Sequence, residues 1–98
     1  MNNILPNTHL LYPAYPNPFN SKVKIRFNIP IEQFVEVSIL NILGETVSVL
    51  TKSEYNSGLN TLVWDGKNDY GQDLSTGLYF CTLKTEKFKD SIKLLLVK

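Results

Sequence analysis

The alternation of apolar and polar residues in short segments is the feature that most limits how this chain folds. In residues 23–29 every second side chain is apolar, namely Val23, Ile25, Phe27 and Ile29. A period of two places successive side chains on opposite faces of a β-strand, so we expect a strand with one buried face. Residues 34–42 show the same pattern, and Pro30 separates the two segments.

Turn-forming residues punctuate the rest of the chain at intervals of about ten residues. Glycine, asparagine and aspartate concentrate at residues 43–45, 56–58 and 65–77. We therefore predict further strands at residues 46–50, 59–64, 78–84 and 91–97. The last of these is nearly continuous in apolar residues, which favours burial on both faces or a central place in its sheet.

Short strands with regular turns and no helical period predict an all-β fold. The expected architecture is an immunoglobulin-like antiparallel β-sandwich of about seven strands. A small open barrel is the alternative, because periodicity does not separate the two. The chain of 98 residues is long enough for one domain of this kind.

The N-terminal segment differs from the rest. Residues 1–14 are predicted to form an extended arm or linker, and residues 15–98 the folded domain. Proline fixes φ and removes a backbone donor, and four prolines lie within the first 20 residues: Pro6, Pro13, Pro16 and Pro18. Aromatic residues within or next to the arm are expected to pin it to the domain: Tyr12, Tyr15 and Phe19. The arm lacks the basic start and long apolar run of a signal peptide, so any export signal of that type is expected elsewhere.

The charge balance argues against nucleic acid and anionic membranes as partners. Ten basic and nine acidic residues leave a net charge of +1, which creates no long-range field for a polyanion. A C-terminal lysine cluster, broken by Glu86 and Asp90, is interpreted as a solvated face, with a docking surface as the alternative. No apolar run reaches the roughly 20 residues of a membrane-spanning helix, so no membrane span is expected.

Few residues are available for catalysis. The sequence has one histidine, His9, and one cysteine, Cys81, so no internal disulfide can form and a Cys–His pair has little support. Cys81 stands in an apolar run and is interpreted as a small core residue. The GxSxG and HExxH motifs and the phosphate-binding loop are absent. We therefore expect a domain that is not an enzyme and that holds no cofactor.

One loop gathers oxygen-bearing side chains that would suit a cation: Asp65, Asn68, Asp69 and Asp73. Oxygen ligands in a short loop are typical of calcium sites, but this spacing differs from that of the EF-hand loop, which ends in Glu. Asp and Asn also form turns by bonding their own backbone. We interpret the loop as a turn region, with a cation site as the weaker alternative.

Three aromatic residues near this loop have structural and functional interpretations. Trp64 is expected in the core with its indole N–H bonded to backbone, and a stacking platform for a sugar or peptide is the alternative. Tyr79 and Phe80 are neighbours on a predicted strand and so point to opposite faces. We expect one of them to be buried and the other to be partly exposed.

Together these segments resemble a known family. YPNPFN at residues 15–20 is followed by VEVSILNILGETVSVL at 35–50, SGLNTLVWDGKNDYGQDLSTGLYFCTL at 57–83 and KLLLVK at 93–98. This order is similar to the type A C-terminal sorting domain of type IX secretion substrates. It also resembles the related immunoglobulin-like domain of the flagellar hook-capping protein.

The resemblance implies a non-catalytic secretion signal at the C-terminus of a larger secreted or cell-surface protein. The implied partners are an outer-membrane secretion shuttle, a sortase-like peptidase and an upstream cargo domain, and the implied location is the cell surface, reached through the periplasm. The implied recognition residues lie on the last two strands: Gly77, Tyr79, Lys93, Leu94, Leu95, Leu96, Val97 and Lys98.

The resemblance also implies that the domain is cut from its cargo. The cut is expected in the arm before Tyr15, where an extended, unpaired backbone would be accessible. An alternative function is a structural or ligand-binding sandwich that accompanies a secreted enzyme, or a hook-cap-like assembly domain.

Overall fold

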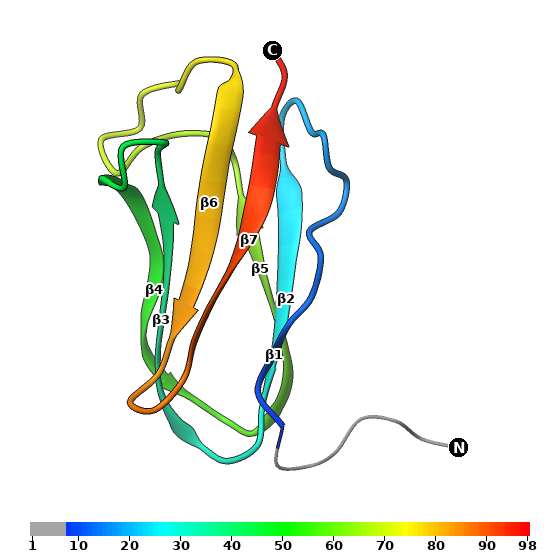
Figure 1. Cartoon of the computed structure of the whole chain (residues 1–98), viewed down its shortest axis with the longest axis vertical. Helices are drawn as coiled ribbons and strands as arrows, with labels where there is room; N and C mark the ends of the chain where they lie inside the picture. Colours follow the sequence, from blue (N-terminus) through cyan, green and yellow to red (C-terminus); the bar gives the residue numbers. More distant parts are fainter. Residues whose placement is uncertain (1–7) are drawn as a thin grey trace.

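The alternating segments become the strands of two antiparallel sheets in the computed structural model, which describes residues 8–98 (Figure 1). One sheet has the order β1 (Leu10–Leu11), β2 (Val23–Ile29), β5 (Gly58–Trp64). The other has the order β4 (Thr46–Tyr55), β3 (Gln33–Leu40), β6 (Gly77–Lys84), β7 (Lys89–Leu96). The predicted sandwich is confirmed over a barrel. No helix in the described part of the chain is long and apolar enough to cross a membrane.

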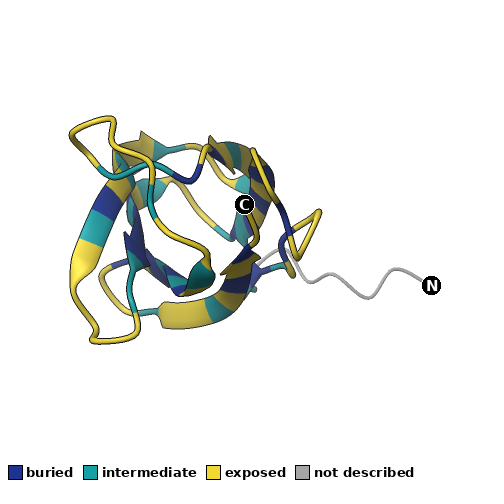
Figure 2. Cartoon of the chain, turned by 90° about the horizontal axis from the view of Figure 1, so that it is seen from above, coloured by how far each residue is buried: buried dark blue, intermediate teal, exposed yellow. Residues whose placement is uncertain are grey.

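The space between the sheets is filled by the inward residues of each strand. Val23, Ile25 and Phe27 on β2 are fully buried, as their alternation predicted. Figure 2 shows buried and exposed positions alternating along the strands. The core is therefore built from every second residue of the strands, which is how a sheet with one solvated face is stabilised.

β4 is longer than the sequence predicted. The expected strand ended at residue 50, but the ladder with β3 runs from Thr46 to Tyr55, with register shifts at Val37/Ser38 and Ile39/Leu40. The second half of β4 is polar and carries little alternation of apolar residues. It remains a strand because its backbone pairs with β3. Since β4 lies at the edge of the sheet, its polar side chains are exposed to solvent.

The prediction for the last strand was wrong in its position. β7 lies at the edge of its sheet and pairs in a ladder only with β6. Leu94 and Leu96 point inward and are 0% exposed, whereas Leu95 is 39% exposed. The apolar run is therefore buried on one face only, because an edge strand of a two-layer sandwich has no second layer to cover its outer face.

The arm is paired in its described part, contrary to the expectation of an unpaired backbone. Leu10 and Leu11 form β1 against β2, and the Tyr12 N–H donates to the Arg26 carbonyl at 3.0 Å. Leu11 is 9% exposed and packs on the core. Residues 1–7 of the predicted arm lie outside the described residues.

Leu94→Ala and Leu95→Ala test the division of β7 into buried and exposed residues. Removing the buried Leu94 side chain is expected to lower the free energy of unfolding by about 2–5 kcal/mol. Removing its exposed neighbour Leu95 is expected to change it by less than about 1 kcal/mol. Urea denaturation measures both, and equal losses would contradict the observed orientation of the strand.

Candidate functional site

The residues predicted for partner recognition separate into two groups in the structure. Tyr79, Leu94 and Leu96 are buried and belong to the core. Gly77 begins β6 opposite Leu96. The remaining four lie on or just beyond β7 and are exposed: Lys93, Leu95, Val97 and Lys98. Only this second group is presented to a partner of the folded domain.

The outer edge of β7 is closed by the segment Asn17–Phe19. The Asn17 side-chain amide donates to the Lys93 carbonyl at 2.9 Å, and its oxygen accepts from the Leu95 N–H at 2.9 Å. The Phe19 N–H donates to the Leu95 carbonyl at 3.0 Å, and the Val97 N–H donates to the Phe19 carbonyl at 2.8 Å. Between Lys93 and Val97 this segment thus takes the place that a neighbouring strand would have.

The same segment seals the end of the core. The Phe19 side chain is 3% exposed, and its ring centroid lies 5.5 Å from that of Trp64 at an interplanar angle of 56°. Trp64 in turn lies 5.5 Å from Tyr79 in an edge-on arrangement, a favourable geometry for aromatic pairs. Gly66 adopts φ +76°, and a Cβ there would lie 3.5 Å from a Leu96 methyl group. Segments far apart in the sequence therefore meet in one cluster.

The polar atoms of the two central aromatic residues are satisfied within the domain. The Trp64 indole N–H donates to the Lys67 carbonyl at 2.9 Å, which confirms its predicted core role. The Tyr79 hydroxyl donates to the Ser75 carbonyl at 2.7 Å, as in the tyrosine corner of immunoglobulin-like sandwiches. Phe80 is half-buried on the opposite face, as predicted for this pair. Tyr79 therefore supports the fold and is not displayed.

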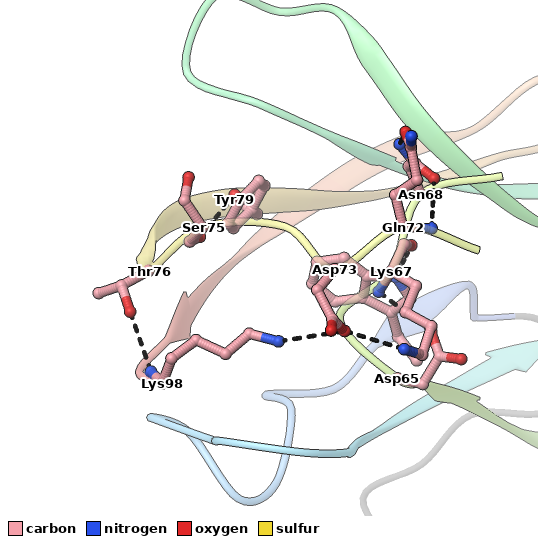
Figure 3. A network of polar contacts seen from close by, with 10 residues as sticks. Asp65, Lys67, Asn68, Gln72, Asp73, Ser75, Thr76, Tyr79 and Lys98 are labelled. Atoms are coloured by element: carbon pink, nitrogen blue, oxygen red, sulfur yellow. Dashed lines mark hydrogen bonds and ion pairs between the residues drawn. The ribbon is translucent and has the colours of Figure 1, made fainter. Parts of the chain in front are cut away.

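The oxygen-bearing loop is held by its own turns and by ion pairs (Figure 3). The Asp65 carboxylate accepts from the Lys67 N–H, and the Asn68 side-chain oxygen accepts from the Tyr70 and Gln72 N–H groups. The Asp69 carboxylate accepts from the Val49 N–H on β4 at 3.0 Å. Within residues 8–98, no group of three or more His, Cys, Asp or Glu side chains is arranged to hold a metal ion.

Asp73 connects this loop to the C-terminus. Its carboxylate lies 2.9 Å from the Lys67 ammonium and 3.5 Å from the Lys98 ammonium. The hydrogen bond and charge of Lys67, followed by those of Lys98, hold the pKa of Asp73 below its usual value. The Lys98 N–H also donates to the Thr76 hydroxyl at 2.9 Å. The end of the chain is therefore fixed beside the start of β6, although exposed ion pairs stabilise little.

The remaining reactive side chains are occupied by packing. Cys81 is fully buried, and burial raises the pKa of its thiol to about 12, so it stays protonated and unreactive at neutral pH. His9 stacks on Phe88 at 4.6 Å and lies 3.4 Å from the Gln33 side-chain oxygen. An open hollow of about 650 Å³ beside His9 is lined by mixed polar and apolar residues of the β2–β3 turn. Neither residue is paired with a partner for nucleophilic catalysis.

Comparison with known families identifies the domain. The model of the secretion system C-terminal sorting domain matches residues 13–98. The chain belongs to this family. The match covers the segment Asn17–Phe19, the aromatic cluster and the whole of β7, so it includes every contact described for the terminal strand. A search of curated proteins finds no match.

Solved structures share the fold of this sorting domain. Latent PorU from Porphyromonas gingivalis superposes with a TM-score of 0.69 at 19% identity, over 99% of this chain and 10% of PorU. FlgD from Pseudomonas aeruginosa gives 0.61 at 22% identity, over 76% of this chain and 60% of FlgD. PorZ, a surface component of the P. gingivalis type IX secretion system, gives 0.59 at 19% identity, over 90% and 11%. At these identities the likeness shows the fold alone.

Sequence reasoning missed the two residues that close the terminal strand. Asn17 was seen only as part of the YPNPFN motif at residues 15–20, and Phe19 only as one of the aromatic residues expected to pin the arm to the domain. Asn17 bonds residues 76 and 78 positions away, and no local pattern announces such a contact. The sequence offered one indication of this contact: the YPNPFN motif at residues 15–20 begins the domain and the apolar strand KLLLVK at residues 93–98 ends it.

Asn17→Ala tests the closure of the edge. The change removes both side-chain bonds to β7 and is expected to lower the free energy of unfolding by about 1–2 kcal/mol. The Leu95 amide, which loses its acceptor, is expected to exchange its hydrogen faster, as measured by NMR. Asn20→Ala is the matched control, since no side-chain hydrogen bond of Asn20 occurs among the described residues. Unchanged protection of the Leu95 amide in Asn17→Ala would contradict the assigned contact.

Proposed function

We propose that this domain is the C-terminal sorting signal of a larger secreted or cell-surface protein and that type IX outer-membrane machinery reads it. The observation that carries the proposal is the family match over residues 13–98, which marks the chain as a sorting domain of a secretion system. The signal directs its cargo through the periplasm to the cell surface or beyond. Its partners are a secretion shuttle and a sortase-like peptidase, with the cargo upstream in the same precursor.

The geometry of β7 supports a role in recognition by the secretion machinery. Its buried residues hold the strand in place, and its exposed residues, Lys93, Leu95 and Val97, stand in fixed positions on the surface. A strand fixed by a core beneath it and by a segment along its edge is preorganised, which reduces the entropy lost on binding. A partner can therefore recognise the surface of the folded strand and not only its linear sequence.

In this proposal the domain is bound and processed by the secretion machinery and is not itself a catalyst. The family is one of sorting signals. Its only thiol, Cys81, is buried, and the carboxylates of its acidic loop bond backbone N–H groups or lysines. These contacts support a passive module whose surface is bound by other proteins.

Separation from the cargo falls, in this proposal, in the arm before Tyr15. Proteases bind their substrates as extended, unpaired chains. The described part of the arm is already paired, because Leu10 and Leu11 form β1 and the Asn28 side chain donates to the Thr8 carbonyl at 2.9 Å. A cut between residues 8 and 12 therefore requires β1 to detach from β2.

A passenger fusion tests the sorting role. A periplasm-directed reporter followed by residues 1–98 is expected to reach the surface or medium of a host with type IX secretion. The same fusion truncated after residue 88, which removes β7, is expected to remain in the periplasm. Cell fractionation and immunoblotting measure both. If the intact fusion stays in the periplasm while an authentic sorting domain exports the same reporter, the proposed function is wrong.

Limited proteolysis tests the paired arm. Proteinase K is expected to cut the wild-type chain slowly between residues 9 and 12. Leu11→Ser removes about 2 kcal/mol of apolar burial, which should increase the detached population of the arm, and thus the rate of cutting there, roughly thirtyfold. Tyr15→Ser is the control, because the Tyr15 side chain is 72% exposed. Mass spectrometry locates the cuts, and equal rates in the wild type and Leu11→Ser would show that β1 gives no protection.

A further inference from the structure

The terminal strand presents only one of its surfaces to a partner of the folded domain. Its inner face is buried through Leu94 and Leu96. From Lys93 to Val97 its outer edge is bonded to Asn17 and Phe19. Strand addition, a common mode of peptide recognition, needs an unpaired edge. A partner that binds the intact domain at residues 93–97 must therefore contact the outward side chains of β7 and of the neighbouring strands in its sheet.

Those outward side chains form a contiguous apolar patch, defined here as Leu40, Leu78, Phe80 and Leu95. Leu78 lies directly opposite Leu95 in the ladder between β6 and β7. Phe80 lies opposite Leu40 in the ladder between β3 and β6. Leu78 is 37% exposed and Leu95 39%. Antiparallel sheets with one wet face normally place polar residues there, so apolar residues opposite one another on that face are not explained by the fold.

Positive charge borders this patch. Lys93 lies opposite Phe80. Lys84 and Lys89 lie further along the same ladder, where Glu36 of β3 is opposite Lys84, so Lys93 is the charge next to the patch. Among residues 8–98 the ion pairs are those of Asp73 with Lys67 and Lys98, so Lys93 has no carboxylate partner within the described domain. An apolar centre with charge at its border is the usual composition of a protein interface.

The other sheet has no such arrangement in the ladder between β2 and β5. Its exposed apolar residues, Leu59 and Val63, are 60% and 51% exposed. Each lies opposite a polar residue, Asn28 and Lys24 respectively. Exposed apolar residues that are isolated in this way are ordinary on protein surfaces. Both sheets therefore carry exposed apolar residues, but only those on the sheet that contains β6 and β7 join into a patch.

We propose that the apolar patch, with Lys93 at its border, is the docking surface for a protein partner. That partner would present apolar side chains edged by carboxylates, because such a surface complements both the patch and the unpaired lysine. This proposal rests on the proposed sorting function and names the surface through which it is exercised. It makes the outward residues of three neighbouring strands, and not the terminal peptide alone, the recognised unit.

The passenger fusion described above tests this surface. The double variant Leu78→Ser/Leu95→Ser is expected to lower the exported fraction at least about tenfold, the scale expected for residues at the centre of an interface. The matched control Leu59→Ser/Val63→Ser, on the other sheet, is expected to export like the wild type. Lys93→Glu is expected to reduce export, and Lys24→Glu, its counterpart on β2, is not. Urea denaturation of each variant shows that it folds.

The outcomes separate the two proposals. If the wild-type fusion is not exported, the sorting function fails and the docking surface fails with it. If the wild type is exported and the folded patch variant is exported equally, only the docking surface is wrong. If the patch variant does not fold, Lys93→Glu decides, and export equal to that of Lys24→Glu overturns the proposal. Sedimentation of residues 1–98 adds a last outcome, because a dimer that Leu95→Ser dissociates would assign the patch to a second copy of the chain instead.

Discussion

The last strand of the domain has a sheet neighbour on one side only, and its other edge must find partners elsewhere. Unpaired backbone groups on such an edge invite pairing with other chains. Asn17 and Phe19 occupy this edge between Lys93 and Val97 with a side-chain amide and a backbone segment. The ring of Phe19 also packs against Trp64 at the end of the core. One short segment thus closes the edge and covers the core at once.

This closure makes the structure of the terminal strand depend on the other end of the domain. The residues that hold β7 come from the segment Asn17–Phe19, from β6 and from the loop before β6, so the contacts of the strand are complete only in the assembled sandwich. Under the proposed function, the machinery that reads β7 therefore receives information about folding as well as identity. Trp64, Tyr79 and Leu96 support the position of β7 from inside the core, although none of them is exposed.

The sequence predicted what local periodicity encodes and missed what depends on long-range pairing. The strand at 23–29 and the opposite faces of Tyr79 and Phe80 follow from a period of two, and both were confirmed. The core roles of Trp64 and Cys81 follow from their residue types and apolar neighbours, and these too were confirmed. The second half of β4, the edge position of β7 and the pairing of β1 did not follow, because each is set by a distant backbone partner. The recognition residues were predicted by resemblance, and only the structure separates those that are buried from those that are displayed.

The register of β7 explains why its edge contacts matter for recognition as well as for stability. In a strand, a slip of one residue exchanges the two faces. A slipped β7 would turn Lys93, Leu95 and Val97 towards the core, and burying an unpaired lysine there is costly. The bonds from Asn17 and Phe19 act on the backbone of the same three residues and therefore fix which side chains face outward. The position of Leu95 opposite Leu78, on which the apolar patch depends, is thus held by the ladder with β6 and by these bonds to the backbone of β7, and not by contacts between the side chains of the patch.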